Sequence, residues 1–96
     1  MAIGEIQAIV TAHFGLLPIE MTSHRRGRSV ARPRQIAMAL AYELTPLSYP
    51  AIGRHFGNRD HSTVIIACQK CEKRIEGSGA FADQIEAIRL YVTKTK

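Results

Sequence analysis

The sequence has few cysteines and no long hydrophobic run. Cys68 and Cys71 are its only cysteines, and on a helix their spacing places both on one face, which suits packing better than a structural disulfide. No apolar stretch approaches the roughly 18 residues that span a bilayer. The N-terminus also lacks the basic and then apolar order of a signal peptide. We therefore expect a soluble, cytoplasmic protein with no membrane partner.

Residues that carry chemistry do not gather in this sequence. His13, His24 and His55 are scattered without metal-ligand spacing, and no nucleophile, base and orienting group fall together. The pair Cys68 and Cys71 could be a redox or zinc pair, but a thioredoxin-like site needs a βαβ context and a structural zinc needs four ligands. The phosphate-binding pattern Gly-x-x-x-x-Gly-Lys-Ser/Thr is missing. We expect no catalytic residue, no ATPase activity, no metal and no cofactor.

Acidic residues are absent from Met21 to Tyr42, and this absence locates the net charge of +5. The stretch holds five basic residues, namely Arg25, Arg26, Arg28, Arg32 and Arg34. Elsewhere eight basic residues balance eight acidic ones. A local excess of arginine indicates a site for an anion such as a nucleic-acid backbone, because guanidinium binds phosphate through a bidentate fork. A solvated basic loop is the alternative interpretation.

Apolar residues recur at helical spacing, and no segment alternates strictly as a half-buried strand does. A first helix is expected from Ile3 to Phe14, ending at Gly15, and a short helical turn from Pro18 to Thr22. A basic loop follows over Ser23 to Val30, and then a helix with Pro33, Arg34 and Gln35 in its first turn, which Thr45 and Pro46 end. We expect one all-α domain over residues 1–96, a compact orthogonal bundle of helices.

The stretch from about 48 to 76 has the proportions of a helix-turn-helix. Ser48 is a good N-cap for a short helix up to Phe56, and after the turn at Gly57 either Asn58 or Asp60 caps a longer helix. The longer helix opens with polar residues and then carries one apolar stripe, namely Val64, Ala67, Cys68, Cys71 and Ile75, while a last helix is expected from Phe81 to Val92. In a helix-turn-helix the second helix enters the major groove by its N-terminal end.

The side chains at that polar end suit base readout. His61, Ser62 and Thr63 can donate or accept hydrogen bonds at base edges, and a threonine methyl can meet a thymine methyl. Asp60 is either a cap or an acceptor for a base amino group. The alternative is that Asp60, Ser62 and Thr63 only satisfy the free amides of a helix N-terminus, and the pattern alone leaves both interpretations open.

Two ordered strings of residues stand out in this sequence. One runs from Phe56 to Val64 as Phe-Gly-Asn-Arg-Asp-His-Ser-Thr-Val, followed by Ala67-Cys68, and the other runs from Arg25 to Gln35 as Arg-Arg-Gly-Arg-Ser-Val-Ala-Arg-Pro-Arg-Gln. Both strings, with the helix after the second, resemble the DNA-binding C-terminal domain, domain IV, of the DnaA family of bacterial chromosomal replication initiators. The similarity covers nearly the whole chain, which makes it far more specific than an isolated helix-turn-helix pattern.

The resemblance implies sequence-specific binding of double-stranded DNA at short boxes of the replication-origin type. It implies that Arg26 enters the minor groove, that Arg34 and Gln35 lie at the major groove and its backbone, and that Arg59 and Pro50 lie near phosphates. The implied DNA-binding set is Arg25, Arg26, Arg28, Arg32, Arg34, Gln35, Pro50, Arg59, Asp60, His61, Ser62 and Thr63. We expect a monomer in isolation.

Some residues depart from the family pattern. Ser62 stands where the family usually has a second threonine, and Asn58 replaces a common glycine, which its tolerance of left-handed backbone permits. Tyr42, Ile66 and Gln69 replace polar or basic residues, which could remove phosphate contacts. Three alternatives therefore remain: an initiator's origin-binding domain, a free-standing regulator of similar boxes, and a protein-interaction module that kept the fold. A module that binds a membrane surface fits less well, because the arginines are not on the polar face of an amphipathic helix.

Overall fold

Helical spacing of apolar residues produces helices along the described chain, which comprises residues 2–94 of the computed structural model. The elements are α1 (Ile3–Phe14), a short 3-10 helix η1 (Pro18–Met21), α2 (Arg28–Leu44), α3 (Tyr49–His55), α4 (His61–Gly77) and α5 (Gly79–Lys94). Residues 2–94 contain no β-strand. The all-α prediction is confirmed, and α3 with α4 occupy the stretch expected to form the helix-turn-helix.

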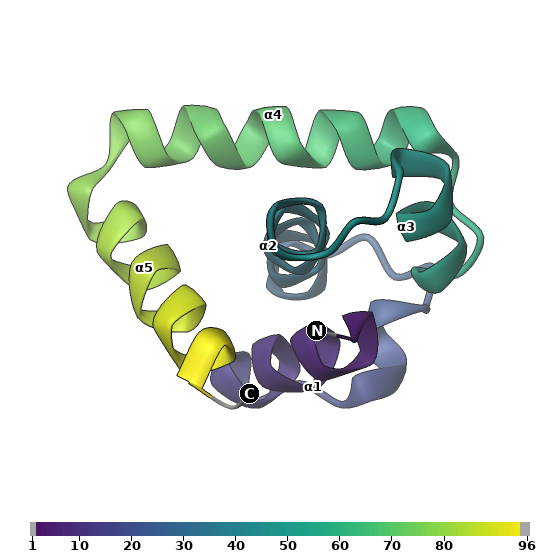
Figure 1. The fold of residues 1–96 in the computed structure, drawn as a ribbon, viewed down its shortest axis with the longest axis horizontal. Coiled ribbons are helices and arrows are strands. Elements are labelled where there is room, and N and C mark those ends of the chain that lie inside the picture. Colours follow the sequence, from purple (N-terminus) through teal and green to yellow (C-terminus); the bar gives the residue numbers. More distant parts are fainter. Residues whose placement is uncertain (1, 95–96) are drawn as a thin grey trace.

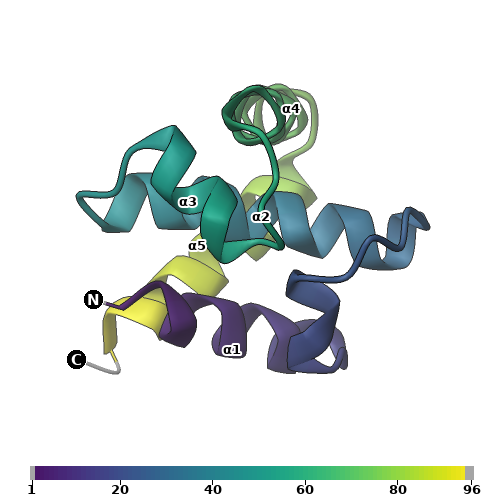
Figure 2. The same cartoon turned by 90° about the vertical axis from the view of Figure 1, so that its right-hand side faces the viewer.

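Helix α2 is the centre of the fold. Figure 1 looks along α2, with α4, α5, α1 and α3 arranged around it, and Figure 2 shows α4 lying across it on one side and α1 on the other. One hydrophobic core joins α2 to the helices around it, and its nearly or fully buried side chains include Ile6, Ile36, Leu40, Phe56, Val64 and Ile88. Because the helices cross α2 in different directions, the bundle is orthogonal, as expected.

The helix ends follow the capping chemistry of the sequence. Gly15 ends α1 in a left-handed conformation, with φ of 67°. The Ser48 hydroxyl accepts from the Ala51 amide at 3.3 Å, and the Asp60 carboxylate accepts from the Ser62 amide at 3.3 Å. Of the two candidate caps for α4, Asp60 is therefore the cap, whereas Asn58 takes the left-handed position of the turn with φ of 57°.

Helix α2 begins earlier than the sequence predicted. Pro33 was expected in its first turn, but α2 starts at Arg28, so Pro33 lies inside the helix and Arg34 and Gln35 lie in the second turn. The Gly27 carbonyl accepts from the amides of Val30 and Ala31, and the Val30 side chain is buried. Burial of the Val30 side chain offsets the hydrogen bond that Pro33 cannot donate. The basic loop is thus shorter than predicted, and Arg28 and Arg32 belong to α2.

Two glycines set the geometry between α3 and α4. A Cβ atom on Gly53 would lie 2.2 Å from the Arg59 carbonyl oxygen, and one on Gly57 would lie 2.4 Å from the Thr22 carbonyl oxygen. Gly57 also has a φ of 76°, which side chains rarely permit. Both contacts are to backbone, which cannot rotate away as a side chain can. Gly53 lets the turn fold back on α3, and Gly57 lets it lie on the segment after η1.

We predict that Gly53→Ala lowers the free energy of unfolding by about 2 kcal/mol or more, since the added methyl meets backbone. Gly4→Ala is the matched control, because nothing lies within 4 Å of a Cβ atom at that helical position. It should raise stability by about 0.5 kcal/mol, as alanine is the better helix former. Urea denaturation followed by circular dichroism measures both, and equal midpoints for the two variants would contradict this account of the turn.

Candidate nucleic-acid interface

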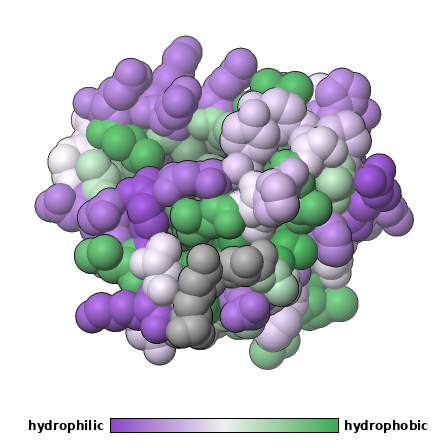
Figure 3. Space-filling view, viewed as in Figure 1, coloured by the Kyte–Doolittle hydropathy of each residue, from purple (hydrophilic) through white to green (hydrophobic). Residues whose placement is uncertain are grey.

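The arginine-rich segment and the polar helix end, which were expected to bind the DNA backbone and the bases, meet at a groove between α2 and α4. The groove has a volume of about 190 Å³, and its lining includes Arg34 and Gln35 from α2, Arg59 from the turn and Thr63 from α4. These residues come from the two strings that resemble the DnaA family. Figure 2 shows α4 next to α2, and in Figure 3 hydrophilic side chains crowd the margin of the molecule that α4 occupies in Figure 1. The fold therefore brings the two strings to one surface.

Arg34 is buried rather than displayed to solvent, with 6% of its surface exposed. Its guanidinium donates to the Glu20 carbonyl oxygen at 3.0 Å and 3.3 Å and to the Arg25 carbonyl oxygen at 3.1 Å and 3.2 Å. A further bond runs to the Ser23 hydroxyl at 3.3 Å. Burial and the nearby Arg59 charge lower the pKa of Arg34, against the opposing effect of Glu20. Arg34 thus holds the start of the basic loop to α2, and its direct contact with DNA stays a prediction.

Glu20 is the acidic anchor of the same loop, and the sequence analysis missed it. Its carboxylate accepts from Arg25 at 2.7 Å and from the Ser23 hydroxyl at 3.3 Å, while the residue is nearly buried. Arg25 itself is exposed, so it is the outer partner of this pair. One signal was available: Glu20 stands immediately before the stretch that has no acidic residue.

Arg59 connects the helix-turn-helix to the basic loop. Its guanidinium donates to the carbonyl oxygens of Phe56, at the end of α3, and of Ser23, in the loop. The side chain is half-buried, and burial lowers its pKa. Arg59 was predicted to lie near a phosphate, and the structure gives it a bridging position within the protein.

The polar end of α4 contains both satisfied and free groups. Asp60 accepts from the hydroxyl and the amide of Ser62, and these bonds lower the pKa of the carboxyl. The His61 Nδ1 atom lies 3.4 Å from the other carboxylate oxygen. The Thr63 hydroxyl has no hydrogen-bond partner among residues 2–94, and the residue is exposed. Capping therefore accounts for Asp60 and Ser62 but leaves Thr63 open to an outside partner.

The remaining predicted residues lie on the surface. Arg26, in the loop, and Arg28 and Arg32, in the first two turns of α2, are exposed, and none has an ion-pair partner among the described residues. Pro50 is exposed near the start of α3. Gln35 is half-buried in the groove. The structure thus divides the predicted set into exposed groups and groups that fix the loop and the turn.

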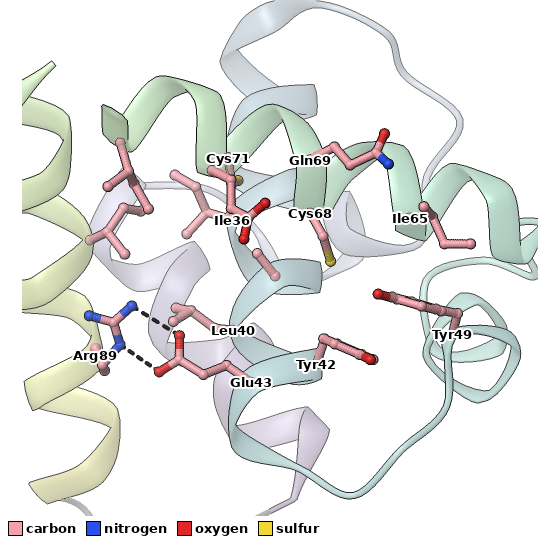
Figure 4. A pocket seen from close by; sticks show the side chains of 14 residues that line it. Ile36, Leu40, Tyr42, Glu43, Tyr49, Ile65, Cys68, Gln69, Cys71 and Arg89 are labelled. Carbon is pink, nitrogen blue, oxygen red and sulfur yellow. Dashed lines mark hydrogen bonds and ion pairs between the residues drawn. The ribbon is translucent and has the colours of Figure 1, made fainter. Parts of the chain in front are cut away.

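The two cysteines and two of the departing residues lie on the other side of α4 from Thr63. A cavity of about 550 Å³ has Cys68, Gln69 and Tyr42 in its lining (Figure 4). The Tyr42 ring stacks on Tyr49 there, with 4.3 Å between the ring centroids. Both thiols are free, and burial raises their pKa values, that of Cys71 to about 11. The prediction that Cys71 packs in the core is confirmed.

Residues 2–94 contain neither a membrane-spanning helix nor a cluster of metal ligands. No described helix combines the length and the apolar character needed to cross a membrane. No group of three or more histidine, cysteine, aspartate or glutamate side chains in this part of the chain could hold a metal ion.

Comparison with known proteins identifies the family of this fold. A family described as "Bacterial dnaA protein helix-turn-helix" matches residues 3–71. The chromosomal replication initiator protein DnaA of Sphingopyxis alaskensis is 54% identical over 89 residues, which are 93% of this chain and 20% of that protein. The DnaA of Gluconobacter oxydans is 46% identical over 89 residues, 93% of this chain and 19% of its own length. That of Psychromonas ingrahamii is 56% identical over 71 residues, 74% of this chain and 16% of its own.

This chain thus spans about a fifth of the length of the curated relatives it matches. The match includes the basic segment, α3 and most of α4, so the resemblance found in the two strings extends through the whole groove that joins them. The chain belongs to the bacterial DnaA helix-turn-helix family.

Proposed function

We propose that this protein binds double-stranded DNA at boxes of the DnaA type. The N-terminal end of α4 enters the major groove, and Arg26 of the basic loop enters the adjacent minor groove. The observation that carries the proposal is the α2/α4 groove, where the arginine-rich segment and the polar end of the second helix meet on one surface. A helix end that reads bases beside a basic loop that follows the backbone is a common plan for sequence-specific binding.

Within this proposal the predicted residues fall into two roles. Thr63 and His61 contact base edges, and exposed Arg26, Arg28, Arg32 and Pro50 face the backbone and the minor groove. Arg34 and Arg59 act mainly by positioning, because their guanidinium groups bond to carbonyl oxygens of the loop and turn. Arg25 completes the loop through Glu20, and Asp60 keeps Ser62 oriented at the helix end.

The proposed biological setting is the initiation of chromosomal DNA replication or its regulation, in the cytoplasm. The relatives carry the name chromosomal replication initiator, and this chain corresponds to about a fifth of each. A regulator that occupies the same boxes would use the same interface, and we propose no catalytic role for these 96 residues. A protein-interaction module is the second candidate, favoured by exposed Ile66, which lines the groove with 49% of its surface accessible.

The test of this function is a fluorescence-anisotropy titration against a duplex with a DnaA-type box and a scrambled duplex, at two salt concentrations. We expect the box to be preferred by more than about tenfold, and the logarithm of the affinity to fall with that of salt at a slope near −4 to −5, if about five phosphates are neutralised. Equal affinity for both duplexes would contradict base readout. Failure to bind either would favour the protein-interaction module.

Arg26 and Arg34 should separate contact from positioning. Arg26→Ala should weaken binding to the box by about 1–3 kcal/mol and leave the unfolding midpoint unchanged, because the side chain is exposed and unpaired. Arg34→Ala should lower the free energy of unfolding by about 1–3 kcal/mol, since it removes the guanidinium that donates to the Glu20 and Arg25 carbonyl oxygens. Thermal melting and anisotropy on both variants measure this. An Arg34→Ala variant as stable as the parent would refute the positioning role.

Ser62→Thr should increase the preference for the box by up to about fourfold. Threonine keeps the hydroxyl that bonds to Asp60 and adds a methyl that can contact a thymine, worth about 0.8 kcal/mol when fully buried. Ser62→Ala is the control, because it removes the hydroxyl and adds no methyl. The ratio of affinities for box and scrambled duplex is the measurement, and a gain on both duplexes alike would argue against a base contact here.

A further inference from the structure

A second cluster of basic side chains lies further along α4 than the base-reading end. It surrounds a hollow of about 460 Å³ between the first half of α2 and the second half of α4. The lining consists of Arg28, Ala31, Arg32, Gln35, Lys70, Lys73 and Arg74. Five of these seven residues are cationic and none is acidic. Lys70, Lys73 and Arg74 had no place in the predicted DNA-binding set.

The five cations of this basic hollow form no ion pair within the described residues, and the acidic Glu72 and Glu76 line a neighbouring hollow instead. None of the four ion pairs found among residues 2–94 involves any of the five cations. Burial lowers the pKa of Arg74, and the positive charge of Arg32 lowers it further. The Arg74 Nη1 atom is buried without a hydrogen-bond partner in the described chain. Like charges that face one hollow without a carboxylate are the arrangement that an external anion stabilises.

Packing holds the innermost of these cations in place. The Arg74 guanidinium carbon lies 3.9 Å from the centroid of the Phe81 ring, so the group lies over an aromatic face contributed by α5. Phe81 itself is nearly buried. A guanidinium held on a ring loses little further freedom when it binds an anion. Arg74 is therefore preorganised, in contrast to the exposed lysines beside it.

The basic hollow is continuous with the α2/α4 groove. Ala31, Gln35 and Lys70 line both. Thr63, Lys70 and Arg74 are spaced by seven and four residues and so share one face of α4. From Thr63 to Arg74 the helix rises about 16 Å. A ligand that follows this face from the base-reading end therefore reaches the hollow. The side chains of residues 61–63 are too far away to contact the ligand at that point.

We propose that the basic hollow binds phosphodiester groups of the same duplex that the N-terminal end of α4 reads. The inference rests on the proposed function and extends its interface along α4 to Lys70, Lys73 and Arg74. The ligand class is phosphate, because guanidinium forks and lysine point charges around one hollow match its oxygens. Continuity with the groove favours the DNA backbone over a free phosphate compound.

The experiment compares Lys70→Gln, Lys73→Gln and the double variant with the parent by anisotropy on the box and scrambled duplexes over a series of salt concentrations. Each single change should make the slope of log affinity against log salt shallower by about 0.9, and the double change by about 1.8. The ratio of box to scrambled affinity should stay unchanged, since the bases are read elsewhere. Lys94→Gln, at the end of α5, is the control of equal charge and should leave the slope as it is.

Each outcome separates this inference from the proposed function. Box preference in the parent with unchanged slopes in the lysine variants would overturn the basic hollow as a backbone site and leave the proposed function standing. No DNA binding by the parent would overturn both. Inorganic pyrophosphate without DNA is the second probe: saturable binding that the double variant loses, together with unchanged DNA slopes, would assign the hollow to a free phosphate compound. Thermal melting of all variants shows that the lysine changes leave the fold intact.

Discussion

The arrangement of the basic loop beside the α2/α4 groove depends on one buried guanidinium, that of Arg34. Arg34 donates five hydrogen bonds to the segment between Glu20 and Arg25, and among residues 2–94 no other side chain joins α2 to that segment so extensively. Arg59 makes the second connection, from the α3/α4 turn to the Ser23 carbonyl. Through these two arginines the basic loop, the central helix and the helix-turn-helix form one unit. Hydrogen bonds from these two guanidinium groups to backbone carbonyl oxygens thereby fix the position of Arg26 relative to Thr63.

This arrangement places positive charges close to one another inside the protein. The charge of Arg59 adds to burial in lowering the pKa of Arg34, and Glu20 is the one acidic group that opposes this shift. Hydrogen bonds to carbonyl oxygens therefore provide most of the stabilisation of the Arg34 charge. These bonds form only when the loop has the conformation seen in the structure. The same carbonyls would be left unpaired if the loop moved, which is expensive for buried groups. The loop that carries Arg25 and Arg26 is therefore held through its own carbonyl oxygens, which accept from the Arg34 and Arg59 side chains.

Most of the fold could be predicted from local patterns, whereas the roles of individual arginines could not. Apolar spacing gave the helices, and Ser48 and Asp60 were recognisable as caps because capping depends on residues only two or three positions apart. The start of α2 was predicted wrongly, because the rule that places proline in a first turn is local, while burial of Val30 is a tertiary effect. Arg34 and Arg26 are the same residue type in one basic stretch, so the sequence cannot tell them apart. The structure separates them, because Arg34 is buried and anchors the loop whereas Arg26 is exposed.

The structure shows which of the departures from the family pattern lie at the α2/α4 groove. Tyr42, Ile66 and Gln69 were grouped as residues that could remove phosphate contacts. Tyr42 and Gln69 line the cavity where Tyr42 stacks on Tyr49, on the side of α4 away from Thr63, and only Ile66 lies in the α2/α4 groove. Two of the three changes therefore leave the groove as it is, while Lys70, Lys73 and Arg74 add positive charge along the face of α4 that continues from Thr63. The balance of charge at the groove follows from which face each residue occupies, and on this surface it is strongly positive.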